Sequence, residues 1–526
     1  MVGLYDNSSH TDELNKVVEE STESKKFSSQ VLISKDLGKT ESTPIKNEPP
    51  YTILSYREIC ATVFLLSCCG FWSAVSNSIY FPALTVIEIS FRVSPELNNV
   101  SIVAYLILQG VSPTLMSFFA DFYGRRPTLC ASLISYAAVC LGISRSNAFW
   151  LLVVLRCFQA SSIASLISIT SASVGDIVST EKRGNFMGIN SGIQLLGQGF
   201  GPLIGALLVH GFGWRGIFVF LAIGSCSVFS ILVFFLLETN RSIVGNLSIR
   251  PTNIVNKAPL LSLSGFRRRM VNDRRTLRQK KSMRAQFVAP FKIFFVPVVL
   301  ASLFAVGIQF CTWNMMLTTL STSLQKKYNK TIIEVGLCYL CPGFGTLSGS
   351  ILGGRVLDLI YKRARLKYDA ENIENKHDQK SQFDIVSTRL KIYYVGTFTS
   401  VCFNLVFGWC VEYRVNLAPI LISTYICSFF STSNIAAVTV LLVDMFPSLS
   451  SALASCMNLM RCLLSAVGVA ALQSMTDKMG EGGCYTLMSG FILLGYVLLK
   501  LTLYLKGIEK IEDLKLLRAF SKIRRK

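Results

Sequence analysis

The sequence predicts an all-α membrane protein whose twelve transmembrane helices form two pseudo-symmetric six-helix bundles. Only 16% of the 526 residues are charged, against about a quarter in a soluble domain, and 51% are hydrophobic. The apolar residues form runs long enough for membrane helices, which need about 20 of them. A polar stretch over 238–290 separates six runs from six more. This pattern excludes an ordinary soluble enzyme, a collagenous chain and a wholly disordered chain, and it disfavours a β-barrel, whose strands alternate apolar and polar residues.

The elements follow one another in a regular order. Residues 1–55 are rich in Ser, Thr, Lys and Glu, so we expect a disordered cytoplasmic tail. They lack the apolar core of a signal peptide, and the first apolar run is expected to target the chain to the membrane. The N-terminal bundle, 56–237, has runs at 59–82, 98–120, 128–145, 148–174, 184–209 and 215–237. After the basic loop 238–290, the C-terminal bundle, 291–506, has runs at 292–320, 332–360, 389–411, 416–442, 452–475 and 484–505, and a basic tail, 507–526, ends the chain.

Basic residues between the runs account for much of the net charge of +21 and predict the orientation. Lys and Arg stay on the cytoplasmic side of a membrane and attract anionic lipid heads, so we expect a lipid partner and no nucleic acid. The basic loops follow even-numbered runs, which places both termini in the cytoplasm. The arginine-rich stretch 267–284 either docks on anionic lipid or only orients the chain. These loops contain Arg125 and Arg126, Lys182 and Arg183, and Lys362 and Arg363.

One basic group breaks this rule. Lys326, Lys327 and Lys330 follow the seventh run, on the predicted outer side. The same loop contains Asn329–Lys330–Thr331, the acceptor pattern for an N-linked glycan, which requires an external face. We therefore predict a glycosylation site at Asn329.

The cysteines predict packing rather than chemistry. There are 16 Cys but only three His, and most Cys lie inside apolar runs. The spaced pair Cys338 and Cys341 has no second pair and no nearby His, so neither a metal site nor a cofactor is expected. Phosphate-binding glycine loops are also absent from the sequence, which disfavours an ATP-driven pump or a redox enzyme.

The two halves repeat a charged pattern at their predicted inner ends. Asp121 precedes Arg125 and Arg126 at the same offsets as Asp358 precedes Lys362 and Arg363. In a second repeat, Asp176 lies 14 residues before Asn190, and Asp444 lies 14 residues before Asn458. Repeated six-span halves predict a transporter with its site between the halves at mid-membrane. Ion pairs around Asp121, Gly124 and Asp176 could latch one conformation. The alternative is a loop that only orients the chain.

Arg156 is the most unusual residue of the fourth run. It lies about 12 Å inside the outer end of that helix, where a charge is costly and must face a cavity or a partner. Snorkelling to the outer surface is the alternative. The polar neighbour Gln159 favours a functional role.

Glycines recur at every fourth position in two runs. Such stripes let another helix approach closely, and a proline allows a bend. Static packing is the simpler interpretation. We expect the two helices to meet between the halves, where the stripes would permit sliding or rocking. The residues are Gly197, Gly201, Pro202 and Gly205 in the fifth run, and Gly345, Gly349 and Gly353 in the eighth.

These motifs resemble those of the major facilitator superfamily. The loop from Ser117 to Pro127 is similar to its signature between spans 2 and 3, with Ser117 and Phe122 departing from the usual residues. Arg156 resembles its span-4 arginine, associated with proton coupling, and the span-5 glycines resemble its antiporter motif. The chain looks most like the fungal twelve-span drug:proton antiporters, in particular the quinidine-resistance-type multidrug exporters of yeasts, on the segments Ser78–Leu84, Glu238–Asn246, Val335–Cys338 and Val443–Ser465. This resemblance covers about residues 55–505, except the arginine-rich part of the central loop. The resemblance implies export of organic cations, weak acids and sometimes amino acids across the plasma membrane.

By analogy with the superfamily, spans 1, 4, 7 and 10 should face a central substrate cavity. Trp and Tyr there could bind organic cations through their rings, while each polar residue could equally make a helix–helix hydrogen bond. Asn458 and Arg461 in span 11 are further candidates. The cavity candidates are Asn77, Tyr80, Arg156, Gln159, Gln309, Trp313, Asn314 and Asn434.

The sequence lacks the usual element of proton coupling, because antiport normally uses a carboxylate inside the membrane and none lies at mid-span. Either an Asp at an inner end acts with Arg156 indirectly, or transport is not proton-driven. We expect a monomeric secondary transporter, not an enzyme, that exports small organic compounds, with protons as the coupling ion. The alternatives are an uptake or uncoupled facilitator for a small metabolite, and a non-transporting membrane sensor on the same fold, which the short tail disfavours.

Overall fold

The computed structural model describes residues 51–179, 182–251, 253–259, 294, 296–374, 385–446 and 450–508. These belong to one compact unit, Tyr51–Lys526. Most of the tail 1–55, the arginine-rich stretch 267–284 and nearly all of the tail 507–526 lie outside the described residues. The described part is helical throughout, which confirms the predicted all-α class.

The N-terminal half contains six membrane segments. The first begins at a capping box, in which Ser55 and Glu58 each accept a backbone N–H of the other. Its helix is interrupted before the outer end by a short 3₁₀ turn that contains a proline. The elements are α2 (Tyr56–Ser78), η2 (Phe81–Ala83), α3 (Leu84–Phe91), α4 (Pro95–Tyr123), α5 (Arg125–Ser144), α6 (Phe149–Ile163), α7 (Ser165–Ile177) and α8 (Arg183–Phe235).

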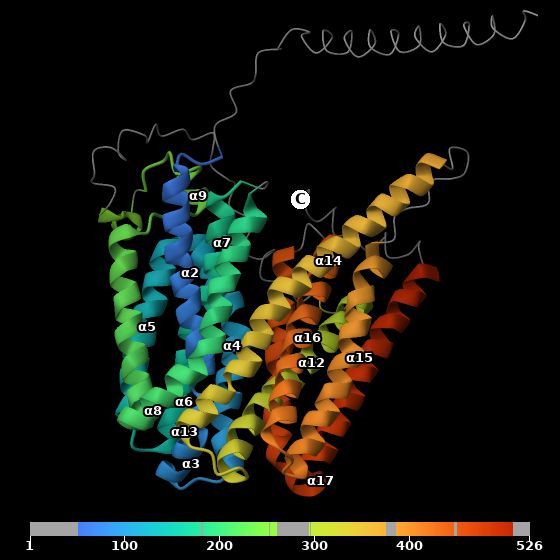
Figure 1. The fold of residues 1–526 in the computed structure, drawn as a ribbon. Helices are drawn as coiled ribbons and strands as arrows, with labels where there is room; N and C mark the ends of the chain where they lie inside the picture. Colours follow the sequence, from blue (N-terminus) through green and yellow to red (C-terminus); the bar gives the residue numbers. More distant parts are fainter. Residues whose placement is uncertain are drawn as a thin grey trace, which may run out of the picture. The chain divides into compact units, whose positions relative to one another are not determined.

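A short connection and the C-terminal half follow. The connection contains α9 (Arg241–Val244) and η3 (Ile254–Asn256). The half itself consists of α12 (Pro297–Lys326), α13 (Ile332–Cys338), α14 (Leu340–Glu374), α15 (Ile385–Glu412), α16 (Leu417–Met445) and α17 (Ser450–Ile508). Figure 1 shows the N-terminal half in blue to green and the C-terminal half in yellow to red.

The segment count supports the predicted twelve spans. Ten helical stretches of the described residues are long and apolar enough to cross a membrane. Two of them, in α8 and α17, are 53 and 52 residues long, more than twice what a bilayer requires. Each contains one glycine in a left-handed conformation, Gly213 (φ 69°) and Gly480 (φ 71°), where the chain turns back. Dividing α8 and α17 there gives twelve segments.

The repeated charge pattern does not give a repeated backbone. Gly124, with φ 120°, separates α4 from α5 directly after Asp121. In the second half, α14 runs helically through Asp358 to Glu374, so the loop predicted after residue 360 is wrong. The side chain of Asp358 is outside the described residues. Without a glycine at the matching position, nothing in the local sequence ends the helix.

Helix packing defines two halves and a seam between them. Within the halves, α2 packs on α8, and α12 packs on α17. Across the seam, α4 meets α17, and α8 meets α13 and α14. We call the end that carries α9 the inner end, at the top of Figure 1, and the end that carries α3 and α13 the outer end.

The three lysines that break the orientation rule are all paired. Lys326 lies 2.8 Å from Glu88, Lys330 lies 3.0 Å from Glu334, and Lys327 contacts Glu481. These carboxylates neutralise the basic charge of the outer loop.

Candidate transport pathway

Glu238 organises the inner end of the N-terminal half. Its side chain is 2% exposed and lies against the N-terminus of α5. One carboxylate oxygen accepts the backbone N–H of Arg125 at 2.8 Å, and the other accepts that of Arg126 at 3.2 Å. Burial raises the pKa of Glu238, and these N–H donors oppose that shift because they favour the carboxylate. A side chain at Gly124 would overlap Glu238, which explains the glycine.

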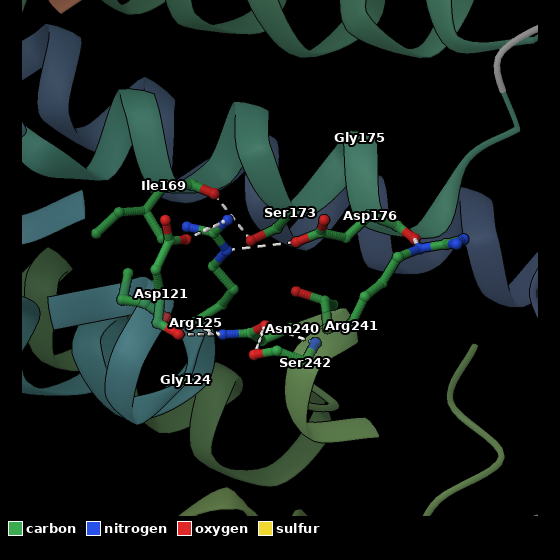
Figure 2. A network of polar contacts seen from close by, with 12 residues as sticks. Asp121, Gly124, Arg125, Ile169, Ser173, Gly175, Asp176, Asn240, Arg241 and Ser242 are labelled. Atoms are coloured by element: carbon green, nitrogen blue, oxygen red, sulfur yellow. Dashed lines mark hydrogen bonds and ion pairs between the residues drawn. The ribbon is translucent and has the colours of Figure 1, made fainter. Parts of the chain in front are cut away.

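Arg125 forms the predicted ion pairs with the inner aspartates. It lies 2.8 Å from Asp121 and 3.3 Å from Asp176, so it joins the α4–α5 turn to the end of α7 (Figure 2). Arg126 does not join this group. Its guanidinium donates to the backbone carbonyls of Val233 and Val255 instead. The pairs of Arg125 lie within the N-terminal half, so a latch between the halves remains a prediction.

The connection after α8 completes this network. Asn240 donates to the carbonyl of Asp121 at 2.9 Å, and Arg241 donates to that of Asp176 at 2.7 Å. The guanidinium of Arg241 also lies over the ring of Tyr51, 3.6 Å from its centroid. Tyr51 in turn donates its hydroxyl to the carbonyl of Gly175 at 3.0 Å. The entry of the chain into the membrane domain and the exit from the first bundle are thus fixed to one inner corner.

The outer end of the seam is closed by contacts between α12 and the η2 turn. Ser321 donates to the carbonyl of Phe81 at 2.8 Å, and Gln325 donates to that of Pro82 at 3.3 Å. The ring of Phe81 stacks on Tyr339, with centroids 6.0 Å apart. The Phe81 carbonyl also accepts the backbone N–H of Leu84, so it is shared between the η2 turn and α12.

A cavity of about 20 Å³ lies on the seam, inward of this closure. That volume suits a water molecule rather than a drug-sized ligand. Three predicted substrate residues, Asn77, Trp313 and Asn314, line it together with the predicted Pro202. Gln198, which the sequence analysis passed over, lines it as well. Residues from both halves therefore surround one point on the seam.

Arg156 is buried inside the N-terminal half at 2% exposure, so it does not snorkel. Its guanidinium lies between two rings, 4.0 Å from the centroid of Tyr80 and 4.3 Å from that of Tyr105. It donates to Gln159 at 2.7 Å, and its Nε has no hydrogen-bond partner. Aromatic faces and an amide replace a carboxylate here. The predicted Tyr80 and Gln159 are thus partners of Arg156 rather than lining of the seam cavity.

The remaining two cavity candidates form a buried pair in the C-terminal half. Asn434 donates to Gln309 at 3.3 Å, and both are almost fully buried. The Nε2 of Gln309 and the Oδ1 of Asn434 have no partner. Each half therefore encloses predicted polar residues with unmade hydrogen bonds.

The glycine stripes lie on a different face from the one expected. Gly197, Gly201 and Gly205 pack on α2, inside their own half. The stripe of Gly345, Gly349 and Gly353 packs on α16, likewise inside its own half. The two helices do meet at the seam, as expected, but their glycine stripes face partners inside each half. Two other glycines meet there: a Cβ on Gly343 would lie 2.6 Å from the Cα of Gly199.

The sequence analysis left Glu238, Arg241 and Tyr51 out of the site. Glu238 and Arg241 stand in a conspicuous polar stretch directly after the sixth run, which could have signalled a role at the inner end. Tyr51 carries no comparable signal. Among the described residues, no group of three or more His, Cys, Asp and Glu is placed to hold a metal ion.

Two repeated helical halves, joined along a membrane seam with polar residues of both around one point, define a secondary transporter. The chain belongs to the Major Facilitator Superfamily, whose sequence model matches residues 66–469. It is 43% identical over 448 residues to the MFS antiporter QDR2 of Candida albicans, covering 85% of this chain and 88% of that protein. It is 36% identical over 478 residues to quinidine resistance protein 1 of Saccharomyces cerevisiae, covering 85% and 84%.

The fold is also found among solved structures. The partially occluded, inward-open xylose transporter XylE from E. coli matches with a TM-score of 0.59 and 13% sequence identity. The match covers 84% of this chain and 98% of that one. These comparisons confirm the predicted family and fold, and the chain is a multi-pass membrane protein.

Proposed function

We propose that this protein exports small organic compounds in exchange for protons by alternating access. Relatives along most of the chain are named an MFS antiporter and a quinidine resistance protein, which supports drug export by antiport. The observation that carries the proposal is the seam, closed at its outer end over a point lined by both halves. Substrate would enter from the inner side, and opening of the outer contacts would release it.

The residues divide into three proposed roles. Asn77, Trp313 and Asn314 contact the substrate from the two sides of the seam. Arg156 couples proton movement to the motion of the two halves. It acts through the buried groups around it, Tyr80, Tyr105 and Gln159. The inner network of Asp121, Arg125 and Asp176, together with the predicted counterpart Asp358, biases the conformation.

We further propose that the protein is a monomer in the plasma membrane with both termini in the cytoplasm. Asn329, which is exposed in the loop after α12, would then carry a glycan on the outer face. The domain boundaries at 56–237 and 291–506 delimit the two bundles.

Inside-out vesicles with an acidic lumen test direction, coupling and substrate together. Quinidine itself is a weak base that an acidic lumen traps without any transporter, so the probe is its permanently charged N-methyl derivative. We expect uptake of this cation only in vesicles that contain the protein, and loss of uptake when nigericin collapses the pH gradient. Added substrate should also raise the lumenal pH, because protons leave as it enters.

The alternatives give different results in the same vesicles. An uncoupled facilitator would equilibrate the cation regardless of the gradient. A sensor would move neither cation nor protons. If the cation accumulates only in right-side-out vesicles with the opposite pH gradient, the protein catalyses uptake rather than export.

A further inference from the structure

Arg461 is a second arginine inside the membrane, and it has no part in the roles proposed for the other residues. It lies in α17, about 12 Å beyond Leu453, where the membrane-spanning stretch of that helix begins. A charge at this depth costs free energy, and membrane spans retain one for a substrate, an ion or a partner. The groups that face Arg461 therefore indicate its use.

The guanidinium of Arg461 lacks a counter-charge. Among the described residues, no ion pair includes it, and the Oδ1 of Asn458, at 3.2 Å, is the one acceptor of its N–H groups. Its Nε is buried without a partner. Its Nη1 has no partner in that part of the chain either, but it is not enclosed, and the side chain is partly exposed. A ligand oxygen can therefore reach Nη1, and an anion there would supply the missing charge.

The guanidinium lies beside the transport pathway. Its Cζ is 4.9 Å from the ring centroid of Phe310. The ring of Phe310 is in turn 5.6 Å from that of Trp313, which lines the seam cavity. Phe310 precedes Trp313 on α12, which runs toward the outer end, so it lies about 5 Å inward of that lining residue. A substrate that enters from the inner side would meet Arg461 and Phe310 before it reaches Trp313.

Asn458 connects Arg461 to the opposite half. Its Oδ1 accepts from Arg461, while its Nδ2 donates to the carbonyl of Gln109 on α4 at 3.0 Å. The helices are close at this point, because a Cβ on Gly110 would lie 2.9 Å from the Cβ of Cys462. The arginine is thus held next to the contact between α4 and α17, on the seam between the halves.

We propose that Arg461 binds the charged group of an aromatic organic anion and thereby selects which substrate charge the pathway accepts. The carboxylate or sulfonate of such a substrate accepts a hydrogen bond from Nη1, and its ring packs beside Phe310 and Trp313. An organic cation would use the aromatic rings alone. This inference rests on the proposed transport function and adds to it a residue that determines specificity.

Equilibrium binding to the full-length protein in phosphatidylcholine nanodiscs tests the proposal without requiring transport. The probe is 2-naphthalenesulfonate, a strong acid that stays ionised. We expect saturable binding that weakens at least about tenfold in Arg461→Gln and is largely restored in Arg461→Lys, which keeps the charge. The uncharged 2-naphthalenesulfonamide should bind equally to the wild type and to Arg461→Gln, because it does not depend on the charge.

A matched variant and a second readout separate selectivity from a structural role. Lys478→Gln removes a charge from an exposed position of the same helix and should leave binding of the anion unchanged. In inside-out vesicles, the ratio of 2-naphthalenesulfonate uptake to uptake of N-methylated quinidine should fall about tenfold in Arg461→Gln. A merely structural arginine would lower both alike.

Two results would overturn the proposal. One is equal binding of 2-naphthalenesulfonate to the wild type and to Arg461→Gln. The other is binding of methanesulfonate as tight as that of 2-naphthalenesulfonate, which would identify a site for simple ions. Charge-dependent binding at Arg461 without transport of either probe would instead contradict the proposed function and support the site.

Discussion

At the scale of single residues, two buried charges are stabilised in opposite ways. Glu238 receives backbone N–H groups at the start of α5, where the helix dipole also favours a negative charge. Arg156 lies among the rings of Tyr80 and Tyr105 and one amide, with its Nε unsatisfied. A buried cation with an unmade hydrogen bond is energetically expensive. Such residues in membrane spans are most often retained for function.

We therefore expect Arg156→Met, which keeps an unbranched side chain of similar volume and removes the charge, to lower transport by at least about tenfold, equivalent to about 1.4 kcal/mol in the barrier. Its thermal unfolding should stay close to that of the wild type, because Met fills similar space. Arg145→Met, at an exposed position, is the matched control. Undiminished export by the Arg156 variant in vesicles would show that the charge has only a packing role.

At the scale of elements, α8 and α14 each pack within their own half on one face and contact the other half on the opposite face. The glycine stripe of each helix holds it to a partner in the same half, α2 or α16. The opposite faces meet at Gly199 and Gly343, where the backbones of the two halves touch. Close backbone contact without interlocking side chains permits one half to move against the other.

This division predicts different defects from similar substitutions. Gly201→Leu would overlap Ser78 on α2, so we expect the protein to lose about 1–3 kcal/mol of stability and to unfold at a lower temperature. Gly343→Leu should abolish transport with a smaller loss of stability, because it obstructs only the approach of the halves. Gly192→Leu, where a Cβ meets nothing within 4 Å, is the control for both. Normal transport by the Gly343 variant would argue against movement at this contact.

At the scale of the whole molecule, the contacts across the outer end of the seam must break for an outer opening. They include the hydrogen bonds of Ser321 and Gln325 to the η2 carbonyls and the pair of Lys326 with Glu88. The pair is partly exposed and is worth at most about 1 kcal/mol. The contacts can therefore close the outer end without locking it.

A reversible cross-link tests whether this end moves. In the double variant Glu88→Cys with Lys326→Cys, an impermeant, reducible bifunctional thiol reagent should abolish transport, and a reductant should restore it. Each single variant, treated with the same reagent, controls for reaction of the reagent with the sixteen native cysteines. Full flux through the cross-linked protein would rule out alternating access through this seam.

The sequence could predict the spans because their signal is local. Run length, the boundaries near Gly124 and the depth of Arg156 all follow from one-dimensional features. The helical course of α14 beyond residue 360 was missed, because charge alone does not end a helix. Glu238 was missed as a site residue, since the partners that tie it to α5, Arg125 and Arg126, lie more than 100 residues away in the chain.

By itself, then, the sequence determined the membrane class, the twelve apolar segments in two halves, the family and the burial of one arginine. Tertiary structure alone decided which face each helix turns to which neighbour. That choice put the glycine stripes inside the halves and Gly199 against Gly343 at the seam. The reason is physical: hydrophobicity along a chain sets how deeply a segment lies in a membrane, whereas the rotation of a helix about its axis depends on packing with all its neighbours at once.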